Sequence, residues 1–92
     1  MIRSFRHRGL KRLFDAGDAR LIRGDLVERV ENILSVLDSA GSPHELGLPG
    51  YRLHPLKGKL KGYWSVTVRA NWRIIFRFQA GDAFDVDLLD YH

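Results

Sequence analysis

The chain has 92 residues, a formal net charge of +4 at pH 7 and a hydrophobic fraction of 45%, values typical of one small folded domain spanning residues 1–92 and not of a disordered chain. Because it contains no cysteine, disulfide bonds, thiolate metal sites and a cysteine nucleophile are excluded. No apolar run approaches the roughly 20 residues of a membrane span, and the basic start of the chain lacks the apolar region of a secretory signal, so we expect a cytoplasmic protein with no membrane partner.

The N-terminal half is predicted to be mainly helical. Residues 1–5 are expected to form a short strand and residues 7–17 a short helix, which Gly17 is placed to end. A longer helix is predicted from residue 25 onwards. Six apolar residues fall on one stripe of its surface: Leu26, Val27, Val30, Ile33, Leu34 and Leu37.

Both ends of the longer helix carry sequence signals. Asp25, with Glu28 three residues later, is interpreted as a capping box in which Asp replaces Ser or Thr. Gly41 and then Pro43 are expected to end the helix. Residues 41–50 are rich in Gly and Pro, so we expect a loop there that separates the helical half from a β-rich half.

The C-terminal half is predicted to form a sheet. Apolar runs occupy residues 51–56, 63–69, 71–78 and 83–91, and the last three alternate apolar and polar side chains with a period of two. Pairing Val68 with Trp72, and Phe78 with Phe84, keeps the apolar faces together. We therefore predict an α+β fold, with an N-terminal strand and helices packed on one face of a mostly antiparallel sheet.

This register separates two arginines of the third run. Arg77 is expected opposite Asp85, which makes it a structural cross-strand ion pair worth at most about 1 kcal/mol if it is exposed. Arg73 is expected opposite Leu89, with no acidic residue facing it. Of the two, Arg73 is therefore the better candidate for binding a ligand.

The chain ends on three proton-handling side chains, Asp90, Tyr91 and His92. The same register places Asp90 beside Trp72 and holds the triplet at the end of the sheet, close to the turn at residues 69–71. Tyr91 offers a ring for base stacking as well as a hydroxyl. Asp90 is suited either to orienting an imidazole or to accepting a hydrogen bond from a base edge.

Basic residues are concentrated in two stretches. Between residues 45 and 82 there is no acidic residue, and the first twelve residues also lack one. Such segregation is typical of a protein that binds a polyanion, most commonly nucleic acid, although a solvated basic surface explains it equally well. The basic residues of the central stretch are Arg52, Lys57, Lys59, Lys61, Arg69, Arg73 and Arg77.

These groups match the needs of RNA cleavage by transesterification. A base must remove the 2′-hydroxyl proton, a cation must stabilise charge on phosphorus, and an acid must protonate the leaving oxygen. His54 and His92 are candidates for the two proton transfers. Arg73 and Lys57 are candidates for holding the phosphate, with Lys59 and Lys61 as further flexible cations on the same loop.

Other readings of these residues remain open. His54, Asp90 and His92 are conceivable metal ligands, but their spacing is not a recognised one, and no metal is expected. A basic module that binds RNA or DNA and acts by occlusion would explain the charge without catalysis. A scaffold role would leave the terminal triplet without a purpose. The remaining histidines, His7 and His44, and both tryptophans are interpreted as structural.

Three segments together resemble the HigB toxins of the RelE superfamily: "LHPLKG", "VRANWRIIF" and the terminal "DYH". The resemblance covers essentially the whole chain. It implies a RelE-like α+β fold and an endoribonuclease, without a cofactor, that depends on the ribosome, cuts mRNA in the decoding site and stops translation. It also implies a HigA-type helix-turn-helix antitoxin, through which the pair contacts operator DNA.

The resemblance also places the functional positions of the family on particular residues. It puts the catalytic positions on His54, Asp90, Tyr91 and His92, all of which match the family pattern. It makes Asn71, Lys57 and Arg73 supporting contacts to mRNA.

Overall fold

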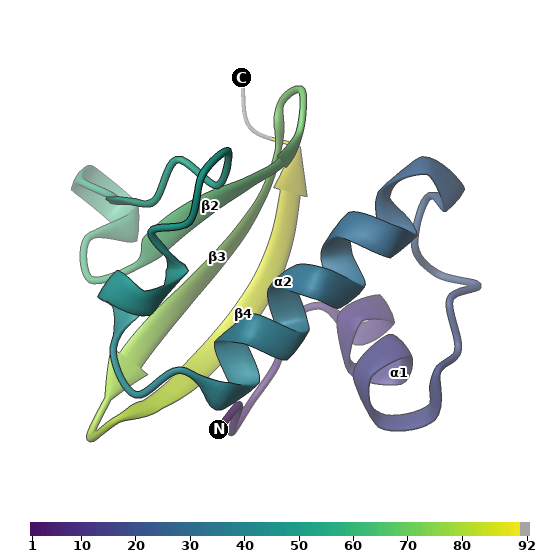
Figure 1. Cartoon of the computed structure of the whole chain (residues 1–92), viewed down its shortest axis with the longest axis horizontal. Helices are drawn as coiled ribbons and strands as arrows, with labels where there is room; N and C mark the ends of the chain where they lie inside the picture. The colour runs from purple at the N-terminus through teal and green to yellow at the C-terminus, as the bar shows by residue number, and fades with distance from the viewer. Residues whose placement is uncertain (91–92) are drawn as a thin grey trace.

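The computed structural model describes residues 1–90 and contains two helices packed against a four-stranded sheet (Figure 1). Every strand pairs with its neighbour in the chain in antiparallel fashion, so the strand order is β1-β2-β3-β4. This confirms the predicted α+β fold. The elements are α1 (Arg8–Ala16), α2 (Val27–Ser39), β1 (His54–Pro55), β2 (Trp64–Arg69), β3 (Trp72–Gln79) and β4 (Asp82–Asp90), with short 3-10 turns η1 (Gly24–Leu26), η2 (Pro43–Leu46) and η3 (Gly58–Leu60).

Helix α1 begins and ends on two residues with clear capping roles. The Nδ1 atom of His7 accepts a hydrogen bond from the backbone N–H of Leu10 at 3.2 Å, which satisfies one donor of the first turn. Gly17 closes the helix in a left-handed conformation with φ of 67°. The predicted stop at Gly17 is therefore confirmed, and His7 has a structural role, as interpreted from the sequence.

Helix α2 buries the predicted apolar stripe but does not begin as predicted. Leu26, Val30, Ile33 and Leu37 are fully buried against the sheet. The predicted capping box is wrong. The 3-10 turn η1 precedes α2, and neither η1 nor α2 begins with a hydrogen bond to a capping side chain. The carboxylate of Asp25 instead pairs with two arginine side chains, which belong to the site described below.

The β2–β3 register is as predicted in the body of the strands and shifts by one residue at the turn. Val66 pairs with Ile74, as the apolar pattern requires. A bulge between Thr67 and Arg69 makes Arg69 the partner of Trp72, where Val68 was expected. The predicted Val68–Trp72 pair is therefore wrong, because the extra residue of a bulge is accommodated where the hairpin tightens into its turn.

A second bulge changes the β3–β4 register near the other turn. Phe78 pairs with Ala83 where Phe84 was expected, and Arg77 pairs with Phe84. Asp85 occupies the bulge with a φ of 54°, and its backbone N–H donates to the Ser4 hydroxyl at 2.9 Å. The predicted ion pair between Arg77 and Asp85 is nevertheless formed, with the two charged groups 3.4 Å apart.

The N-terminal segment joins the sheet along β4 through two isolated bridges instead of a full strand. Ile2 and Phe5 bridge in parallel to Ala83 and Val86. The backbone N–H of Arg3 donates to the Ala83 carbonyl at 2.7 Å. Residues 1–5 thus join the sheet, but in place of the short strand expected from the sequence they form a parallel, interrupted pairing.

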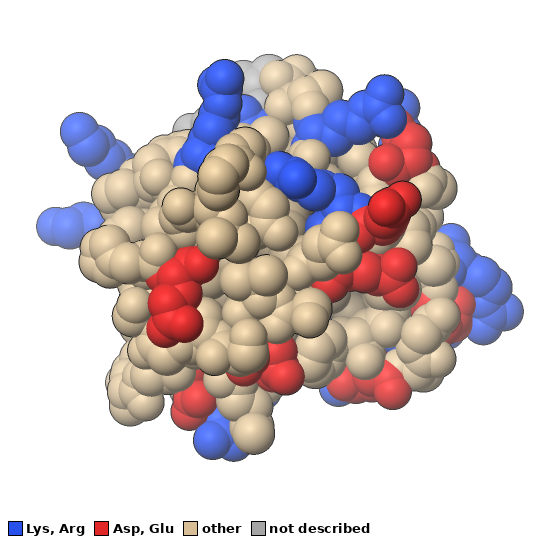
Figure 2. Space-filling model, in the orientation of Figure 1, with Lys and Arg blue, Asp and Glu red and all other residues tan. Residues whose placement is uncertain are grey.

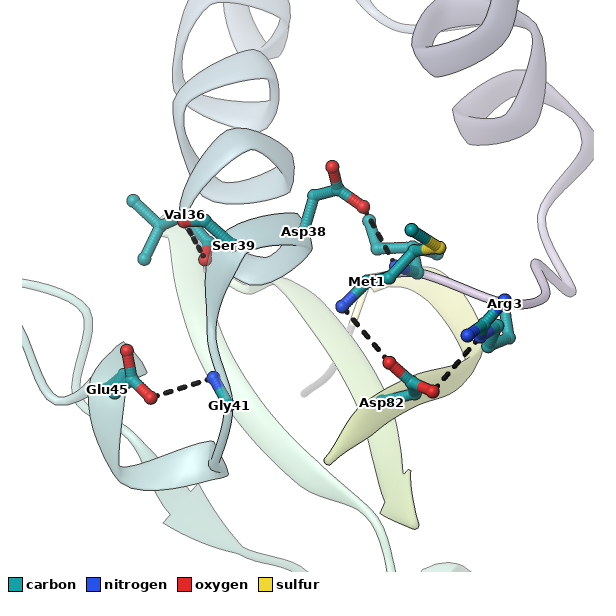
Figure 3. A network of polar contacts seen from close by, with 9 residues as sticks. Met1, Arg3, Val36, Asp38, Ser39, Gly41, Glu45 and Asp82 are labelled. Carbon is teal, nitrogen blue, oxygen red and sulfur yellow. Dashed lines mark hydrogen bonds and ion pairs between the residues drawn. The ribbon is translucent and has the colours of Figure 1, made fainter. Parts of the chain in front are cut away.

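Polar contacts fix the start of the chain between the end of α2 and the start of β4 (Figure 3). Asp82 pairs with the N-terminal amine at 3.3 Å and with the Arg3 guanidinium at 3.0 Å. The backbone N–H of Ile2 donates to the Asp38 carboxylate at 2.9 Å. Beside them, the Gly41 N–H donates to the Glu45 carboxylate at 2.7 Å and holds the chain that leaves α2. No helix within residues 1–90 has the length and apolarity needed to cross a membrane.

Candidate functional site

Alternation along the strands gives the sheet a helix face, packed under α2, and an outer face that points away from it (Figure 1). Directly paired residues share a face. His54, Ser65, Ile75 and Asp87 therefore form one row across the outer face. Ser65 and Ile75 are buried in the middle of this row, whereas His54 is exposed and Asp87 is half-buried at its ends. The two titratable side chains of the row, His54 and Asp87, thus lie at its ends.

One ring nitrogen of His54 is committed to the backbone. Its Nδ1 atom lies 2.9 Å from the carbonyl oxygen of Arg52, whose backbone is left-handed with φ of 51°. A carbonyl oxygen only accepts hydrogen bonds, so Nδ1 carries the proton. The neutral ring then has its lone pair on Nε2, which is the arrangement that a general base requires.

Arg73 lies on the same outer face as His54, in the row formed with Thr67 and Leu89. The prediction that Leu89 and no acidic residue faces it is confirmed. Its Nη1 atom donates to the Ala70 carbonyl at 2.7 Å and to the Trp72 carbonyl at 3.2 Å. These bonds anchor the guanidinium at the β2–β3 turn. Because Arg73 forms no ion pair within residues 1–90, its other N–H groups remain available to an anion.

The three lysines lie on the β1–β2 connection. Lys57, Lys59 and Lys61 are exposed and form no ion pair with any described residue. The connection leads into the start of β2, whereas the 69–71 turn follows its end, roughly 17 Å away at the rise of a β-strand. The structure therefore brings the lysines near His54, three residues before Lys57, and not to the turn.

Asp90 pairs with Trp72, as predicted, and lies at the end of β4. It shares a hollow of about 380 Å³ with the β2–β3 turn and with the residues before α2. We call this the turn hollow, and its lining consists of Arg23, Asp25, Arg69, Ala70, Asn71, Trp72 and Asp90. Figure 2 shows basic side chains above this end of the sheet, while most acidic ones on this side lie lower. Asp90 thus lies close to the turn at residues 69–71, as predicted.

His54 and Asp90 do not meet in the structure. They lie on opposite faces, three strands and three residues apart, a separation of roughly 17 Å between their backbones at ordinary strand spacing. That distance is too long for the two side chains to share a metal ion. Tyr91 and His92 lie outside the described residues, so their predicted positions beside the turn stay predictions.

The outer face also holds a cluster that the sequence did not single out. The Tyr63 hydroxyl accepts from Nη1 of Arg6 at 3.4 Å, and the Arg77 guanidinium lies 5.9 Å from the Tyr63 ring centroid. The hydrogen bond to Tyr63 is the main reason that the pKa of Arg6 is raised, so this side chain stays protonated. The alternation of Tyr63 with Trp64 along the strand indicates that Tyr63 lies on the outer face. No sequence feature near Arg6 indicates that it contacts Tyr63.

The sequence interpretation of the tryptophans is confirmed. Trp64 and Trp72 are half-buried and pack against the core. His44 is exposed, and its ring meets the Trp64 ring edge-on at 5.4 Å between centroids.

Comparisons with known proteins agree with this architecture. A sequence model described as the RelE-like toxin of the type II toxin–antitoxin system HigB matches residues 3–92. The chain is 49% identical to the endoribonuclease HigB of Proteus vulgaris over 92 residues, which is the full length of both. It is 35% identical to the toxin HigB-1 of Vibrio cholerae serotype O1 over 74 residues, 79% of this chain and 77% of that protein.

A solved structure gives the same fold at low sequence similarity. A crystal structure of a YafQ variant from E. coli superposes with a TM-score of 0.56 at 18% identity, covering 95% of this chain and 89% of that one. At that identity the likeness concerns the fold alone. Together, the match over residues 3–92 and the full-length similarity to an enzyme of the same name show that the chain belongs to the HigB family of RelE-like toxins of type II toxin–antitoxin systems.

Proposed function

We propose that the chain is a ribosome-dependent endoribonuclease that cleaves mRNA in the decoding site and thereby inhibits translation in the cytoplasm. The family and the name of its relative in Proteus vulgaris support RNA cleavage. The structural observation that carries the proposal is the hydrogen bond from His54 Nδ1 to the Arg52 carbonyl. It leaves a proton-accepting Nε2 at an exposed position, on the sheet face that also presents Arg73.

The proposed mechanism is attack of the RNA 2′-hydroxyl on the adjacent phosphate, without a metal or other cofactor. Nε2 of His54 takes the 2′-hydroxyl proton as the oxygen bonds to phosphorus, and the bond to the 5′-oxygen breaks. Lys57, three residues after His54, neutralises the charge that builds up on the phosphate oxygens, and Arg73, anchored at the β2–β3 turn, is proposed to hold the RNA backbone there. His92 is proposed to protonate the departing 5′-oxygen, which leaves a 2′,3′-cyclic phosphate and a free 5′-hydroxyl.

The remaining site residues are proposed to bind and orient the RNA strand. Lys59 and Lys61 are exposed cations beside Lys57 that attract the phosphate backbone. Asn71 and Asp90, which line the turn hollow, are suited to hydrogen bonds with base edges. Because Asp90 is remote from His54, we assign it to substrate positioning. Tyr91 is proposed to stack on a base.

The same family membership supports a protein partner. A type II toxin has an antitoxin, and we propose a HigA-type helix-turn-helix protein that binds this chain and, as a complex with it, contacts operator DNA. The ribosome with bound mRNA is the proposed partner during catalysis. The exposed lysines favour ribosomal RNA as part of that contact.

A translation reaction with purified protein and mapped mRNA 5′ ends tests the proposal. We expect cleavage with ribosomes and none of the same RNA alone. His54→Ala should lower the single-turnover cleavage rate about 100- to 10,000-fold, as removal of a general base does, while ribosome binding is kept. His44→Ala is the matched control, since it removes another exposed histidine and should leave the rate unchanged.

Two outcomes would contradict this function. Cleavage of naked RNA at the same sites would remove the dependence on ribosomes. If translation stops without any cut, and His54→Ala still stops it while replacing Lys57, Lys59 and Lys61 abolishes it, the protein acts by occlusion as a basic RNA-binding module.

A further inference from the structure

The turn hollow contains two arginines from different parts of the chain that converge on one carboxylate. Arg23 precedes the 3-10 turn that leads into α2, and Arg69 ends β2. The Asp25 carboxylate lies 2.8 Å from Nε of Arg23 and 3.8 Å from Nη1 of Arg69. Figure 1 shows the start of α2 and the β2–β3 turn at the same end of the molecule. The fold thus holds two guanidinium groups within reach of one anionic group.

The contacts leave N–H donors of both arginines without a protein partner among residues 1–90. The side chains of Arg23 and Arg69 are 63% and 66% exposed. Asp25 is the only acidic partner of either arginine within residues 1–90, and its contact with Arg69 lies near the limit of an ion pair. Asp25 thus serves two guanidinium groups, Asp90 is the second carboxylate in the lining of the turn hollow, and each guanidinium has N–H groups that Asp25 does not occupy.

A phosphate group suits this arrangement better than the single carboxylate does. Its oxygens spread negative charge over several directions, and guanidinium groups bind them through paired N–H donors. Asp25 competes with such an anion for the same donors. When the anion is absent, Asp25 also keeps the two arginines directed into the turn hollow. Asp25 is thus both a positioning residue and a competitor.

We propose that the turn hollow binds a backbone phosphate of the substrate RNA, away from the phosphodiester that is cleaved, through Arg23 and Arg69. The assignment rests on the function proposed above. The turn hollow is also lined by Trp72 and by Asn71 and Asp90. We favour the substrate strand over ribosomal RNA because Asn71 and Asp90 are proposed above to bind base edges of the substrate. Arg73 is also anchored to the carbonyl of Ala70 in this turn. One RNA strand crossing the turn would therefore meet Arg73 and the two arginines in succession.

Cleavage on ribosomes carrying mRNA tests this assignment when rate and apparent affinity are measured separately. Arg23→Ala and Arg69→Ala should each raise the protein concentration needed for half-maximal cleavage about tenfold, as loss of a charged hydrogen bond does. The rate at saturation should stay within about twofold of the parent rate. Asp25→Asn should lower that concentration, because the competitor is removed. If Asp25 only supports the fold, Asp25→Asn should instead raise the half-maximal concentration.

The control is Arg3→Ala, which removes an exposed arginine that is also paired with an aspartate, at the opposite end of β4 (Figure 3). It changes the net charge by the same amount and should leave the half-maximal concentration unchanged. Arg69→Lys keeps the charge without the planar donor pair and should fall between parent and Arg69→Ala. Far-ultraviolet circular dichroism of each variant confirms that it folds.

The results separate this inference from the proposed function. If the parent protein does not cleave, the function itself fails. If the parent cleaves and the half-maximal concentration is unchanged in Arg23→Ala and Arg69→Ala, only the phosphate assignment is overturned. An equal loss of binding to ribosomes that carry no mRNA would also overturn it, because the phosphate would then belong to ribosomal RNA.

Discussion

At the scale of single residues, the proposed function depends on a side chain, His54, that is held by the backbone beside it. The Arg52 carbonyl selects which nitrogen of His54 carries the proton. Arg52 itself has a left-handed backbone conformation, which directs its carbonyl toward the imidazole. The imidazole that we propose as the general base is thus oriented by a backbone carbonyl, where a buried carboxylate commonly performs this task. The cost of a positive φ at a residue other than glycine, about 1 kcal/mol or more, is the local strain associated with this arrangement.

Acid sensitivity is expected at another residue, Asp82. The hydrogen bond from Arg3 is the main cause of its lowered pKa, with the N-terminal amine adding to it. A carboxyl group whose pKa is lower in the folded state stabilises the fold above its unfolded pKa of about 4 and loses that contribution as the pH falls further. Asp82→Asn should therefore reduce the free energy of unfolding at pH 7. It should also flatten the decline of stability below about pH 4, which urea unfolding at several pH values measures.

A double-mutant cycle controls for other effects of this change. Arg3→Ala should act on the same ion pair, so the combined variant should lose less stability than the sum of the two single changes. Additive losses, or a decline below about pH 4 as steep as that of the parent, would show that the Arg3–Asp82 contact is not responsible.

Single contacts in the site differed in how far the sequence could predict them. The pairing of Arg73 with Leu89, and of Asp90 with Trp72, follows from strand periodicity alone and was predicted. Arg23 and Asp25 gave no such signal, because their approach to Arg69 depends on where the start of α2 packs. Asp25 was assigned to a helix cap, since local spacing cannot show that an arginine distant in sequence will compete for its carboxylate.

At the scale of elements, the two hairpins show where periodicity stops being informative. The central pairs of β2, β3 and β4 have the predicted register, and both departures occur beside turns. A bulge adds one residue without changing which side chains are apolar. At the second bulge, the left-handed backbone of Asp85 absorbs the extra residue, and the buried positions Val86 and Leu88 remain on the core side. Apolar pattern alone does not locate such a residue.

The β3–β4 turn offers a stabilising substitution. Ala80 and Gly81 connect the paired residues Gln79 and Asp82, and both have positive φ, of 53° and 84°. This is a two-residue turn that favours Asn followed by Gly. Ala80→Asn should therefore raise the free energy of unfolding by about 1 kcal/mol, measured by urea unfolding with an unchanged slope.

The opposite change at the same position is the control. Ala80→Val places a β-branched side chain at a positive φ and should destabilise the protein. If Asn and Val shift the urea midpoint in the same direction, the backbone conformation is not the cause of either effect.

At the scale of the whole molecule, stability depends on a core between the helices and one face of the sheet. Phe76 is the largest fully buried side chain within residues 1–90 and lies on β3, one of the two inner strands. Phe76→Ala should cost about 3–5 kcal/mol, a large share of the total stability of about 5–15 kcal/mol that is usual for such domains. Phe14→Ala, at a position 37% exposed, should cost far less. Urea unfolding of both variants compares the two positions.

A similar loss of stability for both variants would mean that the sheet core does not dominate the stability of the fold.

The position of this core was predictable, because the apolar stripe of α2 and the alternating strands both indicate which faces meet. The separation of His54 from Asp90 was not, since it depends on the order of four strands and on which face each residue takes.

The interrupted pairing along β4 has a consequence for how the molecule meets others. Strands at the edges of a sheet expose unpaired N–H and C=O groups, through which proteins join edge to edge. Here residues 2–5 already pair with the free edge of β4 at Ala83 and Val86. The opposite edge, β1, is two residues long and contains Pro55, which has no N–H to donate. At β1 and along the first half of β4, the sheet thus offers no bare strand. At these two places, a second copy or a protein that silences the toxin must recognise side chains instead of extending the sheet.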